Sequence, residues 1–90
     1  MEEILKRIKA LADKNRLKII EMLLEKNYCV SALSRQLNIS ESAVSQQLKI
    51  LREADLVRGI KEGYYVHYEV KTEELKNLGK YILNLEKEQK

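Results

Sequence analysis

The stretch from Leu33 to Leu51, LSRQLNISESAVSQQLKIL, constrains the fold more than any other part of the chain. It holds two short helical patterns with a tight polar break at residues 38–40 between them. In the second pattern, the apolar residues Val44, Leu48 and Leu51 fall on one side of a 3.6-residue helix. The opposite side carries hydroxyls, amides and one charge, on Ser42, Ser45, Gln46 and Lys49. Such a stripe suits the reading of base edges in a DNA groove.

Length, charge and cysteine content indicate one small, basic domain. The chain has 90 residues, a formal net charge of +3 and a single cysteine, so no intramolecular disulfide can form and a cytoplasmic location is expected. A domain of this size buries roughly two-thirds or less of its unfolded surface, which favours self-association. No apolar run approaches the ~20 residues that span a bilayer. We therefore expect a single domain over residues 1–90 that forms a homodimer.

Periodicity and capping residues predict helices on both sides of the break. Asp13 and Ser40 have the side chains of N-caps, and Glu41 suits the positive end of a helix dipole. The expected helices before the hairpin cover residues 1–12, a segment from Asp13 to near Lys26, residues 31–37 and residues 41–54.

After Asp55 the period changes to that of strands. Residues 57–61 and 64–70 are rich in β-branched and aromatic side chains, and the first of these runs carries Arg58 and Lys61. Glu62-Gly63 lies between them, where glycine can supply a positive φ angle. The sequence therefore predicts a two-stranded hairpin.

The first and last helical patterns carry apolar residues suited to helix pairing. Thr72 is expected to cap the last helix, over residues 72–87, in which leucine or isoleucine recurs at intervals of 3, 4 and 3 residues. A seam this short should pack on the first helix and on the same surface of a second copy. The predicted dimer-interface residues are Ile4, Leu5, Ile8, Leu75, Leu78, Ile82 and Leu85.

The order of these elements is that of a winged helix-turn-helix, and three phrases resemble the ArsR family of dimeric repressors. They are IKALADKNRLKIIEMLL from Ile8, YCVSALSRQLNISESAVSQQLKILREADLV from Tyr28 and KEGYYVHYEV from Lys61. The ungapped spacing makes the resemblance more specific than a lone helix-turn-helix pattern. It implies a mainly α fold of five helices plus a two-stranded wing, with residues 31–54 as the helix-turn-helix, 57–70 as the wing, and 1–12 with 72–87 as dimerisation helices.

The resemblance implies that the helix at residues 41–54 enters the major groove of double-stranded DNA. Glutamine can pair bidentately with adenine, and serine accepts several partners. The wing would follow the backbone or minor groove, with less electrostatic grip than in relatives, because Ile60 and Tyr64 stand where family wings often carry arginines. The predicted DNA-binding residues are Ser40, Ser42, Ser45, Gln46, Gln47, Lys49, Arg58 and Lys61. Further candidates for phosphate contacts are Lys6, Arg7, Lys14 and Arg16.

These properties predict a homodimeric, sequence-specific DNA-binding repressor of an inverted-repeat operator, with recognition helices about 34 Å apart. The alternative is a winged-helix module that docks a protein through the same helix. The Ser/Gln surface favours DNA, because protein interfaces centre on aromatic and apolar anchors. The sequence contains no Ser/His/Asp set, glycine-rich phosphate loop or paired metal ligands, so neither an enzyme nor a cofactor is expected.

Metal or thiol sensing, which many relatives show, rests here on Cys29 alone. The resemblance aligns Cys29 with a Cys-x-Cys thiolate site whose second thiol is replaced by Ser31. A buried, inert Cys29 is therefore expected, with sensing as the weaker alternative and the effector left open.

A second family metal site lies on the last helix. The resemblance places it at Thr72, Glu74, Leu85 and Glu88. Leucine cannot bind a metal ion, so no metal site is predicted there. The only histidine, His67, is expected to be packed or solvated beside Tyr65 or Tyr68 on the wing.

Overall fold

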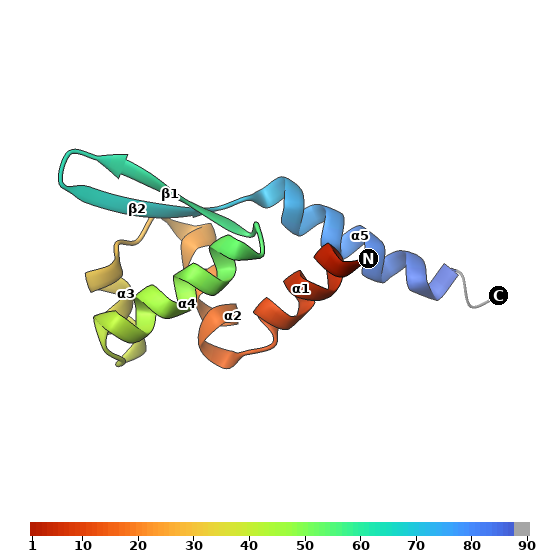
Figure 1. Ribbon diagram of the computed structural model, residues 1–90, viewed down its shortest axis with the longest axis horizontal. Helices are drawn as coiled ribbons and strands as arrows, with labels where there is room; N and C mark the ends of the chain where they lie inside the picture. The colour runs from red at the N-terminus through yellow and green to blue at the C-terminus, as the bar shows by residue number, and fades with distance from the viewer. Residues whose placement is uncertain (88–90) are drawn as a thin grey trace.

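The computed structural model describes residues 1–87, which form five helices and one antiparallel hairpin (Figure 1). Glu88 lies outside the described residues. α1 and α5 lie together at one end of the elongated molecule, while α3, α4 and the hairpin tip lie at the other. In chain order the elements are α1 (Glu2–Leu11), α2 (Lys14–Glu25), α3 (Val30–Leu37), α4 (Glu41–Glu53), β1 (Val57–Glu62), β2 (Tyr65–Val70) and α5 (Thr72–Lys87). This is the predicted winged helix-turn-helix.

Two side-chain caps begin α2 and α4, as the sequence predicts. The Asp13 carboxylate accepts hydrogen bonds from the backbone amides of Asn15 and Arg16, at 3.0 and 3.1 Å. The Ser40 hydroxyl accepts one from the amide of Ala43 at 3.0 Å. Between the helices, Asn38 ends α3 in the left-handed conformation, with a φ of 57°. Asparagine tolerates this conformation, so the turn closes within three residues without a glycine.

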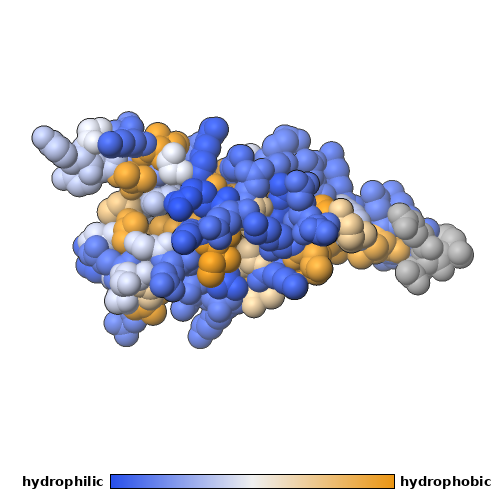
Figure 2. Space-filling view, viewed as in Figure 1, coloured by the Kyte–Doolittle hydropathy of each residue, from blue (hydrophilic) through white to orange (hydrophobic). Residues whose placement is uncertain are grey.

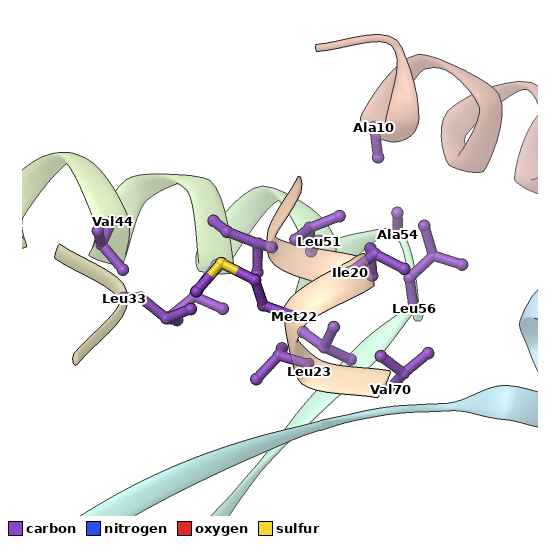
Figure 3. Close-up of a cluster of buried hydrophobic side chains, with 13 residues drawn as sticks. Ala10, Ile20, Met22, Leu23, Leu33, Val44, Leu51, Ala54, Leu56 and Val70 are labelled. Carbon is purple, nitrogen blue, oxygen red and sulfur yellow. The ribbon is translucent and has the colours of Figure 1, made fainter. Parts of the chain in front are cut away.

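The hydrophobic core joins α2, α3, α4 and the base of the hairpin (Figure 3). The apolar side of α4 is fully covered, because Val44, Leu48 and Leu51 are each 0% exposed. Leu33 of α3 and Leu56, just before β1, are equally buried. Burial of this one side fixes the rotation of α4 and leaves its polar side in solvent.

The hairpin turn lies one residue later than predicted. β1 and β2 pair from Val57 opposite Val70 to Glu62 opposite Tyr65, so the two-residue turn is Gly63-Tyr64 rather than Glu62-Gly63. The register is set at the base of the hairpin, where Val57 and Val70 are both buried. Gly63 has the positive φ, 61°, expected for its residue type.

The start of α5 also differs from the prediction. Thr72 is its first helical residue rather than its cap, and the carbonyl of the preceding Lys71 accepts the amides of Glu74 and Leu75. The helix then runs beside α1, with Leu78 buried at 3% exposure and the Tyr81 hydroxyl 3.6 Å from the sulfur of Met1. Leu78, predicted at the dimer interface, is thus already covered within the protomer.

No helix among residues 1–87 is both long and apolar enough to cross a membrane.

Candidate nucleic-acid interface

The polar side of α4 is the centre of the candidate interface. Ser42, Ser45, Gln46 and Lys49 are all exposed there, as predicted from their spacing. Ser40 is exposed as well, but its hydroxyl is engaged as the cap of α4. Because α4 is held by its buried side, these polar groups point away from the core on a rigid element.

Gln47 lies at the edge of this surface and already has a partner. Its side chain is half-buried, and its Oε1 accepts a hydrogen bond from Nη1 of Arg16 at 2.9 Å. A guanidinium group only donates, so the amide oxygen must be the atom that faces it. Bidentate pairing with adenine needs that oxygen, which makes Gln46 the better reader of adenine.

Ile50 belongs to the same surface, although sequence reasoning missed it. It is 38% exposed and lines a shallow depression of about 300 Å³ with Gln46, Lys49 and Glu53. An apolar group in such a place can contact the methyl group of thymine. A helical wheel could have found it, as the one large apolar residue on the polar side of α4.

The wing presents less free positive charge than its two basic residues imply. Arg58 pairs with Glu69 on the neighbouring strand, although its side chain is 65% exposed. Lys61 is exposed, and Tyr64 at the turn is fully exposed. The internal pairing of Arg58 is thus a second reason to expect a weak electrostatic grip of the wing on DNA.

Arg7 is not a surface residue, and its predicted contact with phosphate is wrong. It is 9% exposed, and its Nε donates to the carbonyl of Ala54 at 2.9 Å. Its Nη2 donates to Asp55 at 3.3 Å and to Glu74 at 3.2 Å. The candidates Lys6 and Lys14 remain exposed, whereas Arg16 is half-buried and bonded within the chain.

Asp55 joins the end of α4 to the start of α5. The pKa of its carboxyl is lowered from the ordinary value of 3.8, mainly because Lys71 donates a hydrogen bond to it. Partial desolvation acts in the opposite direction, and the positive charges of Lys71 and Arg7 lower the pKa further. A depressed folded-state pKa means that the ionised form stabilises the fold. This contribution is present above the unfolded pKa and is lost as the pH falls through the folded pKa.

The Asp55→Asn substitution should therefore make the free energy of unfolding fall less steeply as the pH is lowered. Asparagine tolerates the left-handed backbone at this position, where φ is 63°. Urea unfolding of both proteins from about pH 6 down to about pH 3 would measure the slope, with the exposed Glu53→Gln variant as control. Equal slopes for wild type and Asp55→Asn would contradict the assignment.

Cys29 and His67 lie next to each other across an isolated antiparallel bridge, a pairing that their separation in sequence concealed. Both are half-buried, so the expectation of a buried Cys29 is only partly met. His67 Nε2 lies 3.2 Å from the carboxylate of Glu62.

Within residues 1–87 there is no group of three or more side chains placed to hold a metal ion. On α5, the Glu74 carboxylate is bonded to Arg7.

Comparison with known proteins identifies the family. Residues 13–58 match the family described as "Bacterial regulatory protein, arsR family". The chain is 41% identical over 69 residues to a "Transcriptional repressor SmtB homolog" of Synechocystis, covering 77% of this chain and 52% of that protein. It is 42% identical over 69 residues to the "Transcriptional activator HlyU" of Vibrio cholerae, covering 77% and 64%. It thus spans less than two-thirds of either relative.

The fold has a close structural counterpart. A solution structure from Mycobacterium bovis, described as a homodimeric winged helix-turn-helix DNA-binding domain, superposes with a TM-score of 0.79 at 24% identity, covering 98% of this chain and 82% of the other. The matched residues 13–58 contain α2, α3 and α4, including the surface described above. The chain belongs to the arsR family of bacterial regulatory proteins.

Proposed function

We propose that the protein is a sequence-specific DNA-binding transcriptional regulator that acts as a homodimer on an inverted-repeat operator. The observation that carries this proposal is the polar side of α4, the second helix of a helix-turn-helix in an arsR-family chain. It presents Ser42, Ser45 and Gln46 to solvent on a helix fixed by its buried side. Hydroxyl and amide groups in this arrangement can donate to and accept from base edges in the major groove.

The remaining contacts follow from the same placement. Lys49 on α4 would meet phosphate, and Lys61 and Tyr64 would bring the wing against the backbone or minor groove. Arg58 would contribute after exchanging Glu69 for a phosphate. Lys6 and Lys14 are exposed and available for backbone contacts.

Exposed apolar side chains on α1 and α5 support the homodimer. Figure 2 shows hydrophobic patches on the face where these helices lie side by side. Their exposure ranges from 37% for Ile8 to 72% for Leu83, which the interface prediction omitted. Apolar groups concentrated in this way on a small domain mark a contact surface. The exposed members of this surface are Leu5, Ile8, Ile82, Leu83 and Leu85, with Ile4 and Leu75 half-buried beside them.

Repression is the mode of regulation that we propose, although the named relatives include both a repressor and an activator. A dimer bound at a promoter blocks other proteins from the DNA simply by occupying it. Repression therefore needs no further interaction surface on the protein. The effector stays open, and the protein would act in the cytoplasm with its DNA. Docking of a protein partner by α4 is the weaker alternative, because the exposed side of residues 41–53 carries no aromatic anchor.

Replacing Ser45 and Gln46 together by alanine should abolish the preference for operator over random DNA. Each base pairing that the substitution removes is worth about 1–3 kcal/mol of discrimination, while the phosphate contacts remain. Binding of wild type and variant to a selected operator and to a random duplex, at one stated salt concentration, measures the ratio. Sedimentation of the same samples shows whether the dimer is intact.

The matched control is Asn27→Ala with Gln36→Ala, which removes two exposed polar side chains that lie outside α4 and outside the proposed dimer helices α1 and α5. It should bind as the wild type does. An unchanged preference in the Ser45/Gln46 variant would rule out this surface as the reader of sequence.

A further inference from the structure

Arg16, which lies on α2, forms hydrogen bonds both to the C-terminal end of α1 and to the middle of α4. Its Nε donates to the carbonyl of Ala10 at 2.6 Å, and its Nη2 donates to the carbonyl of Lys9 at 3.4 Å. Its Nη1 donates to Gln47 Oε1 at 2.9 Å. Each nitrogen of the planar guanidinium therefore has an acceptor, and two of the three acceptors belong to α1. The Ala10 carbonyl lies in the last turn of α1, where carbonyls lack a partner within the helix, so the bond from Nε satisfies it. The Lys9 carbonyl also accepts the backbone amide of Ala12, at 3.2 Å.

Arg7 makes a second connection, from α1 to the C-terminal end of α4. It donates to the carbonyl of Ala54, the C-cap of α4, and to the side chain of Asp55 directly after it. The same guanidinium reaches Glu74 on α5. The bond from Arg7 to the Ala54 carbonyl is buried, whereas the carboxylates of Asp55 and Glu74 are 46% and 26% exposed. The first bond is therefore screened by salt much less than the two ion pairs are.

We propose that Arg7 and Arg16 are positioning residues that hold the recognition helix α4 at a fixed distance and angle from α1, and so determine the spacing of operator half-sites. The inference rests on the proposed function, in which α1 contributes to the dimer interface. In such a dimer the two α4 helices are related through the two α1 helices, so the α1–α4 attachment in each protomer determines how far apart they lie.

Half-site spacing is a sensitive measure of that attachment. One added base pair moves a half-site by about 3.4 Å and rotates it by roughly 35° about the DNA axis, because a turn contains 10–10.5 base pairs. A rigid pair of helices cannot follow this change, whereas a loosely attached pair can. Two separated attachment points on α4 restrain the angle between α4 and α1 as well as the distance between them, which one bond would not do.

The experiment compares wild type with Arg16→Met, which keeps the apolar stem but removes all three hydrogen bonds. Binding is measured to a single half-site and to full operators with one or two base pairs added or removed at the centre. We expect wild type to lose about tenfold in affinity for each change, comparable to one mismatched base pair, and Arg16→Met to lose about threefold or less. Half-site affinity should be similar in the two proteins. Lys80→Met, which removes the same charge from the exposed side of α5, is the control and should keep the wild-type profile.

Failure of the inference and failure of the proposed function give different results in these binding measurements. An Arg16→Met profile as sharp as that of wild type overturns the inference, as does a parallel loss of half-site and full-site binding, which would make Arg16 a DNA contact. If Arg16→Met does not fold by circular dichroism, Gln47→Leu removes the bond to α4 and keeps the bonds from Arg16 to the carbonyls of α1. Because Gln47 lies at the edge of the candidate interface, its full-site affinities are divided by its half-site affinity. A flattened profile then supports the inference, and an unchanged one overturns it. A wild type without preference for an inverted repeat refutes the proposed function instead.

Discussion

Replacing Leu48 by alanine should lower the free energy of unfolding by about 2–5 kcal/mol, because the side chain is completely buried and its removal leaves a cavity. A domain of this size has a total stability of about 5–15 kcal/mol, so at the lower end of that range the loss would remove about two-fifths or more of it. Chemical denaturation at a fixed protein concentration measures it, because dimerisation would add to the apparent stability.

Ile50→Ala is the matched control for Leu48→Ala. It lies on the same helix, is 38% exposed, and should lose clearly less stability than Leu48→Ala, about 1 kcal/mol. If the two variants lost equal stability, the orientation of α4 described above would be wrong, because burial of one side is what distinguishes the two positions.

DNA affinity should fall by about 10³–10⁵ when the salt concentration rises from about 50 to about 200 mM, if the dimer neutralises six to ten phosphates. Lys49 and Lys61 carry exposed positive charge on α4 and on the wing, and each phosphate contact releases counterions. The slope of log affinity against log salt, measured on operator and random duplex, reports the number of such contacts.

Lys49→Ala should reduce that slope by about 1 for each phosphate that the variant no longer neutralises, and it should weaken binding to all sequences alike. The Lys80→Ala variant, altered on the exposed side of α5, should keep the wild-type slope. A nearly flat response of the wild type would contradict DNA binding through this surface.

The elements of the fold could be predicted because their signals are local. The caps at Asp13 and Ser40 and the spacing of Val44, Leu48 and Leu51 all lie within a few residues of what they determine. They are sufficient to place α4 and to separate its buried side from its exposed side. The hairpin turn was misplaced by one residue, because its register depends on burial of Val57 and Val70 at the opposite end.

The roles of the charged residues could not be predicted in the same way. Arg7 and Arg16 have neighbours in sequence like those of any exposed arginine, and only the tertiary packing brings them to Ala54, Asp55 and Gln47. The proximity of Cys29 and His67 likewise depends on a bridge between segments far apart in the chain. The sequence shows how many charged and reactive side chains there are. Which of them are exposed to solvent depends on long-range contacts that the sequence does not show.

The internal use of arginine affects how this protein can recognise DNA. Four of its five arginines donate side-chain hydrogen bonds within the chain, from Arg7, Arg16, Arg35 and Arg58. Lysine therefore supplies most of the mobile positive charge, as a compact ammonium on a flexible stem that adapts to many phosphate positions. A lysine cannot form the two-pronged pair with guanine that a surface arginine forms. A Lys49→Arg exchange would thus add a rigid guanine reader to a surface that, in the proposed complex, meets the DNA backbone through an adaptable charge.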